Sequence, residues 1–274
     1  MIEIKNPYLM FIGDVPDQLA AKTADGVAHW RRDWCLGQIR LEGCKADLGL
    51  PDMSVAEAAE AGVKTLIVGV TNQGGYFADT WVETMHSAID HGMDIASGMH
   101  AKLSTVPGLA EKAETAGRQL YDVRHTDQTF DIGRGHKRSG KRLLTVGTDT
   151  SCGKMFTALT LEKEMRARGM KADFRATGQT GIFIAGHGVA IDAVVSDFIS
   201  GSVEWLCPEN DPAHWDLVEG QGSIFHAGYA GVTLGLIHGA QPDVMVVCHD
   251  PGRPHMRGTP AIPVRSLSEV IEAT

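Results

Sequence analysis

The sequence predicts an α/β protein with two parallel-sheet domains. Short apolar runs alternate with helix-like stretches through both halves, a polar and basic stretch interrupts the alternation at 126–141, and a strand, a glycine-bounded loop and a helix then follow in turn. Alternating strands and helices form parallel sheets with helices on their faces. We therefore expect an N-terminal domain over 1–125, a basic linker over 126–141 and a second domain over 142–274.

The N-terminal half shows the alternation most clearly after residue 54. KTLIVGV at 64–70 is a strongly apolar strand, and two capping boxes, Ser54 with Glu57 and Thr80 with Glu83, mark the starts of helices. The expected elements are strands at 8–12, 64–70, 94–96 and 119–122, and helices at 54–61, 80–91 and 109–116.

The C-terminal half restarts the pattern. Its expected elements are strands at 143–146, 172–175, 216–219 and 243–248, and helices at 154–168, 191–199 and 229–238. A last capping box, Ser266 with Glu269, opens a helix that meets the end of the sequence at Thr274. Because a helix of about two turns is short, we expect this domain to be truncated at its C-terminal end.

The basic stretch between the two halves has two interpretations. Its cationic side chains are Arg134, His136, Lys137, Arg138, Lys141 and Arg142. A run of like charges is usually solvated, as in a linker. Alternatively, these side chains reach phosphates that are bound at the neighbouring loop.

Composition limits the classes of function. The 274 residues carry a formal net charge of −9, which argues against nucleic-acid binding, because that needs a basic face. No apolar run has the length of a membrane span, and the N-terminus lacks a signal-peptide pattern. The five cysteines include no C-x-x-C pair, which argues against a disulfide framework or a structural zinc site. We expect a cytoplasmic protein with a small-molecule substrate, without nucleic-acid or membrane partners, and leave a homo-oligomer open.

The most informative segment is GTDTSCGKM at 147–155, between an apolar strand and a helix. A glycine-bounded loop before a helix forms a P-loop, whose amides and lysine bind a phosphate. Met155 stands where nucleotide hydrolases carry the Ser or Thr that ligates magnesium, and a thioether is a poor ligand for a hard cation. We expect no bound metal. The expected phosphate-binding residues are Gly147, Thr148, Asp149, Thr150, Ser151, Cys152, Gly153, Lys154 and Met155.

Two more loops follow expected strands of the second domain, where ligands bind in open α/β sheets. RATGQTG at 175–181 interleaves polar side chains with glycines, and Glu219 ends the run DLVE. A carboxylate in this position is a candidate general base, with Asp192 and His226 as alternatives. Each of these residues also has a structural interpretation, as a buried polar group that only bonds its own loop. The candidate substrate-binding residues are Arg175, Thr177, Gln179, Thr180 and Gln221.

Weaker candidates lie elsewhere. The segments 72–75 and 97–100 follow strands of the first domain, and 249–251 follows the last strand of the second. WRRDW at 30–34 is either a carboxylate clamp or a pair of surface arginines beside tryptophans. A nucleophilic role for Cys152 is not favoured, because no His is adjacent in sequence to act as its base.

Several motifs together resemble a known family. GTDT-x-x-GK alone is similar to dethiobiotin synthetase and its relatives. With RATGQTGIFIAG (175–186), DAVVSDFISG (192–201), VEGQGSIFHAGYAGVTLGLIHG (218–239) and PDVMVVCHDPGRPHMRG (242–258), the chain resembles the DgcN family of N-acetyltransferases. The resemblance covers nearly the whole chain and implies a Rossmann-like domain followed by a P-loop domain of the dethiobiotin synthetase type.

The resemblance also implies a function. Members of this family transfer an acetyl group from acetyl-CoA to the amino group of D-glutamate or a related D-amino acid, in D-amino-acid catabolism beside an enolase-like enzyme. Thr148 to Met155 would then hold CoA phosphates, and Met155 is typical of the family. The alternative is an ATP- and magnesium-dependent ligase or NTPase of the dethiobiotin synthetase type, which Met155 opposes. A nucleotide-sensing module without catalysis is a third hypothesis.

Overall fold

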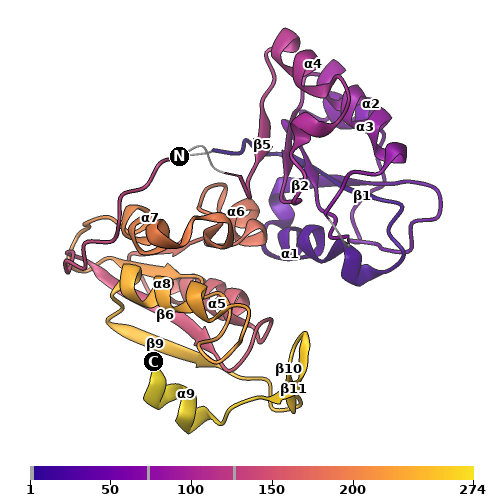
Figure 1. Ribbon diagram of the computed structural model, residues 1–274. Helices are drawn as coiled ribbons and strands as arrows, with labels where there is room; N and C mark the ends of the chain where they lie inside the picture. Colours follow the sequence, from indigo (N-terminus) through magenta and orange to yellow (C-terminus); the bar gives the residue numbers. More distant parts are fainter. Residues whose placement is uncertain (1–2, 73–74, 126–127) are drawn as a thin grey trace. The chain divides into compact units, whose positions relative to one another are not determined.

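The computed structural model describes residues 3–72, 75–125 and 128–274 and contains two compact units (Figure 1). One unit comprises residues 1–126 and 182–187, and the other comprises 127–181 and 188–274. Each unit is built on a parallel sheet, so the expected α/β class with two parallel-sheet domains is confirmed. Among the described helices, none is long and apolar enough to cross a membrane.

The first unit contains a five-stranded sheet in the order β2-β1-β3-β4-β5. Tyr8 pairs with Thr65, and Leu66 pairs with Ile95, in parallel register. The central strands are buried along their whole length, as expected for a parallel sheet that helices cover. The strands are β1 (Tyr8–Gly13), β2 (Cys35–Arg40), β3 (Thr65–Val68), β4 (Asp94–Ser97) and β5 (Leu120–Asp122), and the helices are α1 (Lys22–Trp30), α2 (Val55–Glu60), α3 (Asp79–Asp90) and α4 (Leu109–Ala116).

Two features of the first unit differ from the prediction. Strand β2 and helix α1 were not expected, because β2 carries a polar Gln38 and the sequence of α1 contains Gly26, a poor helix former. Gln38 is nevertheless buried, and its side chain bonds the Asp47 carboxylate. The expected Thr80 capping box is wrong, because α3 begins one residue earlier and the Thr80 hydroxyl bonds Asp14 instead. The capping box at Ser54 is confirmed.

The second unit contains a four-stranded parallel sheet in the order β7-β8-β6-β9, and a separate two-stranded antiparallel hairpin. Its strands are β6 (Lys141–Gly147), β7 (Ala172–Arg175), β8 (Trp215–Val218), β9 (Val244–Cys248), β10 (His255–Met256) and β11 (Thr259–Pro263). Its helices are α5 (Lys154–Ala167), α7 (Ile199–Leu206), α8 (Ala230–Ala240) and α9 (Leu267–Ala273), and α6 (Gln179–Ala185) begins in it.

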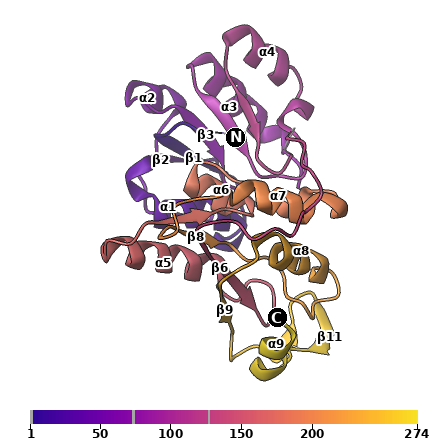
Figure 2. The same ribbon diagram turned by 90° about the vertical axis from the view of Figure 1, so that its left-hand side faces the viewer.

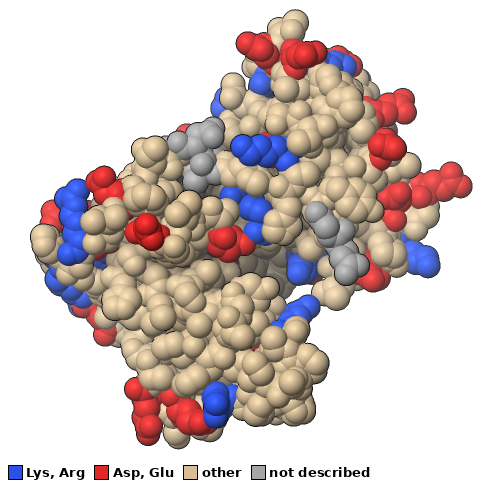
Figure 3. All heavy atoms as spheres, viewed as in Figure 1, with Lys and Arg blue, Asp and Glu red and all other residues tan. Residues whose placement is uncertain are grey.

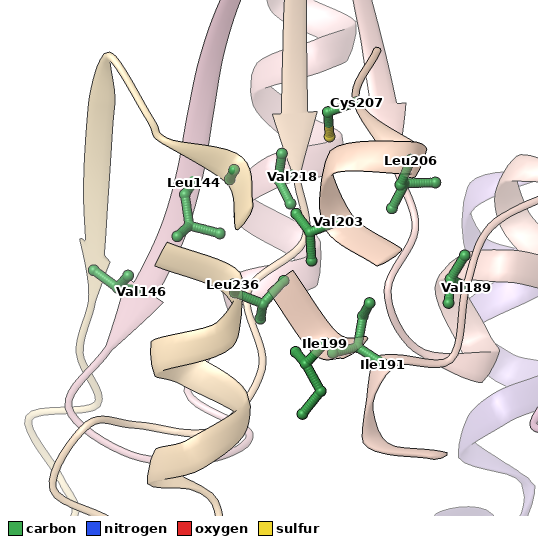
Figure 4. Close-up of a cluster of buried hydrophobic side chains, with 11 residues drawn as sticks. Leu144, Val146, Val189, Ile191, Ile199, Val203, Leu206, Cys207, Val218 and Leu236 are labelled. Carbon is green, nitrogen blue, oxygen red and sulfur yellow. The ribbon is translucent and has the colours of Figure 1, made fainter. Parts of the chain in front are cut away.

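Alternating strand residues bury the two faces of this sheet. Leu144 and Val218 pack with Val203 of α7 and Leu236 of α8 (Figure 4). Their neighbours Leu143 and Leu217 belong to a second buried cluster, with Leu161 and Met165 of α5 packed against it. Because successive strand residues point to opposite faces, α5 covers one face and the α7–α8 pair covers the other (Figure 2).

The expected helix at 191–199 is wrong in position. Two short 3-10 turns, Ile191–Ala193 and Ser196–Phe198, occupy this segment, and α7 begins only at Ile199. The amides of Val189 and Ile191 donate to the carbonyls of Ala176 and Thr177, so the segment is tied to the loop after β7. The capping box of Ser266 and Glu269 at the start of α9 is confirmed.

The basic stretch from 134 to 142 belongs to the second unit and packs against its helices α7 and α8. The amides of Arg134 and Gly135 donate to Glu204 of α7, and the Arg138 guanidinium donates to the carbonyls of Cys207 and Gly239. Arg134, His136, Lys137 and Lys141 are exposed to solvent, as in the first interpretation. The guanidinium groups of Arg138 and Arg142 instead bond backbone carbonyls outside the P-loop. Elsewhere, acidic and basic side chains are interspersed on the face shown in Figure 3.

Candidate active site

The loop between β6 and α5 forms an anion cradle. Ser151 and Gly153 have positive φ angles of 48° and 101°. Left-handed residues in such a loop direct neighbouring amides to one side. Within the described part of the chain, the amides of Ser151, Cys152 and Gly153 donate no hydrogen bond, and they lie at the N-terminal end of α5. The loop therefore offers free donors and the positive end of a helix to an anion.

The carbonyl groups of the same loop are occupied. The Asp149 carbonyl accepts a hydrogen bond from the Lys154 ammonium at 2.7 Å. The Arg253 guanidinium donates to the carbonyls of Thr150 at 2.6 Å and Ser151 at 3.1 Å. These cations hold the loop in place and leave its amides for a ligand.

Gly147 is required at the start of the loop by close packing. A Cβ atom there would lie 2.5 Å from the Cys152 sulfur and 3.2 Å from the Lys154 nitrogen. The Cys152 thiol donates to the carbonyls of Asp149 and Cys248, so it is engaged as a structural donor. Thr148 is buried, and its hydroxyl lies 3.0 Å from Nδ1 of His249.

Asp149 is a buried carboxylate that joins two loops. It accepts hydrogen bonds from the Thr150 amide, the Arg253 guanidinium and the Arg257 amide, at 2.7, 2.8 and 2.8 Å. Burial raises its pKa, but these donors outweigh burial and hold the pKa of Asp149 below its usual value. Asp149 is therefore an ionised brace within the loop rather than a proton acceptor.

Glu219 lies at the carboxyl end of β8 and is only 4% exposed. Its Oε2 accepts hydrogen bonds from the amides of Thr177 at 2.9 Å and Gly178 at 3.1 Å. Burial raises the pKa of Glu219 to about 7, against the lowering effects of these two amides and of the Lys154 charge, and the nearby charge of Asp192 raises it further. A carboxyl with this pKa can accept a proton near neutral pH.

Glycines leave room for the Glu219 carboxylate. A Cβ at Gly181 would lie 2.3 Å from Oε2 of Glu219, and one at Gly220 would lie 1.6 Å from the Thr145 carbonyl. The Gly220 amide donates to the Thr145 hydroxyl at 2.9 Å. Helix α6 therefore approaches the Glu219 carboxylate, and the loop after β8 approaches β6, more closely than side chains would allow.

The other polar residues of these loops take different positions. The Thr177 hydroxyl donates to the Glu219 carbonyl at 2.6 Å and lies 3.2 Å from Nε2 of Gln221, so the structure brings these residues together with Glu219. Gln179 and Thr180 are half-buried in the first turn of α6.

The two alternative candidates for the base differ from Glu219. Asp192 is exposed in a 3-10 turn and acts on Glu219 through its charge. Both ring nitrogens of His226 are engaged, because Nδ1 accepts from the Gly228 amide at 3.1 Å and Nε2 therefore donates to the Arg257 carbonyl at 2.9 Å. His226 has no ring nitrogen left for a substrate proton, which favours Glu219 as the base.

Arg175 is already paired. Its Nε donates to the buried Asp216 carboxylate at 2.7 Å, and its side chain is 12% exposed. A bound carboxylate would have to compete with Asp216 for this guanidinium, so the geometry argues against Arg175 as a substrate clamp.

The weaker candidates have structural contacts. In the first unit Arg31 stacks on Trp34 at 5.2 Å, and Arg32 bonds the carbonyls of Leu48 and Gly49, which is the surface interpretation of WRRDW. The Ser97 hydroxyl accepts from the Met99 amide. Of the segment 72–75, residues 73 and 74 lie outside the described residues.

Sequence reasoning missed three participants of the site, namely Thr145, Arg253 and Arg257. Thr145 lies in an apolar strand, and Arg253 and Arg257 lie about one hundred residues beyond the loop they bond, at separations of 104 and 108 residues from Asp149. Both arginines lie in the motif at 242–258, but no spacing rule connects that motif to the P-loop.

Comparisons with known proteins bear on this arrangement. A family model described as a domain of unknown function (DUF1611), P-loop domain, matches residues 130–274, and one described as its Rossmann-like N-terminal domain matches residues 39–126. A crystal structure of a DUF1611 family protein from Anabaena variabilis has a TM-score of 0.85 and 31% sequence identity, and the match covers 98% of this chain and 81% of that one.

Two relatives have names that state an activity. A protein named D-glutamate N-acetyltransferase from Tritonibacter scottomollicae is 54% identical over 97% of this chain and 80% of its own length. A second protein of that name, from a Pseudoalteromonas species, is 48% identical over 99% of this chain and 82% of its own length. The resemblance drawn from the motifs is confirmed, and the chain belongs to the DUF1611 family, in which a Rossmann-like domain precedes a P-loop domain.

Proposed function

We propose that this protein is an N-acetyltransferase that moves an acetyl group from acetyl-CoA to the amino group of D-glutamate. The observation that carries the proposal is the buried Glu219, with a pKa raised to about 7, beside a P-loop whose lysine is followed by Met155. The relatives named D-glutamate N-acetyltransferase, at 54% and 48% identity, support the same reaction.

The P-loop suits the phosphates of CoA. The free amides of Ser151, Cys152 and Gly153 and the ammonium of Lys154 provide the donors. Met155 supplies no oxygen ligand for magnesium, which a nucleotide hydrolase would need at this position. Binding the phosphates of CoA needs only hydrogen-bond donors and positive charge, and the loop provides both. The thioester of the bound donor would supply the activated acetyl group.

Glu219 would act as the general base. An amino group attacks a carbonyl carbon only as the neutral amine, so the D-glutamate ammonium must lose a proton. Oε2 of Glu219 is held by the amides of Thr177 and Gly178, which fixes the carboxylate, and the other oxygen can take the proton. A pKa near 7 lets Glu219 both accept this proton and release it afterwards.

Backbone amides next to Glu219 are candidates for stabilising negative charge on the carbonyl oxygen. The Gly220 amide is used by Thr145 and is not available. Within the described residues, the amides of Gln221 and Gly222 make no hydrogen bond. Such preorganised donors stabilise an oxyanion in acyl transfer.

A single assay separates this function from the ATP-dependent alternative. The full chain is incubated with D-glutamate and acetyl-CoA, or with D-glutamate, ATP and magnesium, and the release of thiol and of phosphate is followed. We expect thiol release that requires D-glutamate, with L-glutamate as the stereochemical control. Phosphate release without thiol release would instead establish a ligase or NTPase.

A further inference from the structure

The backbone amide and carbonyl of Arg257 hold the turn of the β10–β11 hairpin in place. The Arg257 amide donates to Asp149 at 2.8 Å, and its carbonyl accepts from His226 at 2.9 Å. The hairpin is thus fixed both to the P-loop and to the loop that follows Glu219. Met256 beside it is buried, which anchors the hairpin further.

The side chain of Arg257 is not used by this arrangement. It is exposed, and among the residues that the structure describes its guanidinium makes no ion pair or hydrogen bond. Arg253 differs, because its guanidinium is spent on Asp149 and on the carbonyls of the P-loop. The backbone of Arg257 is fixed beside the phosphate cradle, and its exposed guanidinium is free to bind a second anion within reach of that backbone.

We propose that Arg257 binds the phosphate monoester on the ribose of CoA, while the P-loop amides and Lys154 hold the pyrophosphate. This inference rests on the proposed function, in which CoA is the donor. A phosphate monoester offers oxygens that a guanidinium binds through two parallel hydrogen bonds. The Asp149 carboxylate that accepts the Arg257 amide also accepts the Thr150 amide, so the turn lies directly beside the cradle.

The test measures binding of CoA and of dephospho-CoA, which lacks this phosphate, by calorimetry. In R257Q the affinity for CoA should fall about tenfold, the loss of one charge-assisted interaction, while the affinity for dephospho-CoA stays within about twofold. R257M makes the same comparison with a second neutral side chain. R168Q is the matched control, because it removes the same charge at the far end of α5, and it should bind both ligands as the wild type does.

Three outcomes would overturn the inference. Equal losses of affinity for CoA and dephospho-CoA would show a structural effect of the substitution, and unchanged CoA affinity would show that Arg257 makes no contact. A raised KM for D-glutamate with unchanged CoA affinity would assign Arg257 to the substrate carboxylates. A wild-type protein that binds neither ligand would instead refute the proposed function itself.

Discussion

Asp149 and Arg253 form an ion pair of 2.8 Å that joins the P-loop to the loop after β9. Asp149 is 1% exposed, and its pKa lies below its usual value because donors from both loops outweigh its burial. A carboxyl whose pKa is lower in the folded state stabilises the fold above its unfolded pKa. That contribution is lost as the pH falls through the folded pKa, so the brace is complete at neutral pH.

We expect R253Q to lower both stability and CoA affinity. The substitution leaves the Asp149 charge buried with fewer donors and frees the carbonyls of Thr150 and Ser151. Unfolding in urea should show a loss of about 2 kcal/mol, and calorimetry should show weaker CoA binding. R168Q, which breaks an exposed pair with Glu164, should change stability by no more than about 0.5 kcal/mol. A stability of R253Q equal to that of R168Q would contradict the role of this brace.

The rate should depend on the ionisation of Glu219. The base must be deprotonated to act. The value of kcat/KM for D-glutamate should therefore rise with pH and level off at high pH, with the midpoint of the rise near pH 7, the pKa of this buried carboxyl. E219Q should lower kcat about 100-fold or more and abolish this midpoint, while CoA affinity stays near the wild-type value. A pH profile of E219Q with the wild-type midpoint would remove Glu219 as the base.

The same group should make stability depend on pH. The pKa of Glu219 is raised from 4.5 to about 7 in the folded state, so the folded protein holds a proton that the unfolded chain releases between these values. The contribution of Glu219 to the free energy of unfolding is fully present below pH 4.5 and is lost as the pH rises through 7. The loss amounts to about 3 kcal/mol at most. In E219Q this decline in the free energy of unfolding should be absent. Parallel stability profiles of E219Q and wild type would show that the pKa of Glu219 is not raised.

The fold class, the P-loop and the position of Glu219 at the end of a strand could be predicted because each depends on residues close together in the sequence, whereas the role of Glu219 as the base stays a prediction. Hydrophobic runs, a glycine-bounded loop before a helix and a carboxylate at a strand end are all visible within about ten residues. The helix α9 was placed correctly because its capping box is also local.

The contacts that were missed are long-range. The tie between Asp149 and Arg253 spans 104 residues, and nothing in the local sequence predicts it. The displaced helix at 191–199 has the same cause, since the amides of Val189 and Ile191, just before and at its expected start, donate to the carbonyls of Ala176 and Thr177 in the loop after β7. His226 looked catalytic from its place near Glu219, but its ring is consumed by Gly228 and Arg257.

G181A should impair the base without disturbing the fold. An added Cβ would lie 2.3 Å from Oε2 of Glu219, so the carboxylate would have to leave the amides of Thr177 and Gly178. Those amides lower the pKa of Glu219, and without them the midpoint of the pH–rate profile should move above 7 and kcat at neutral pH should fall.

Alanine favours a helix over glycine, so loss of helical structure in α6 would not explain a lower rate. The matched control is G231A in α8, where no described residue lies within 4 Å of the added atom, and it should keep the wild-type rate and midpoint. If G181A kept the wild-type midpoint as well, the hydrogen bonds from Thr177 and Gly178 would not be what sets the ionisation of Glu219.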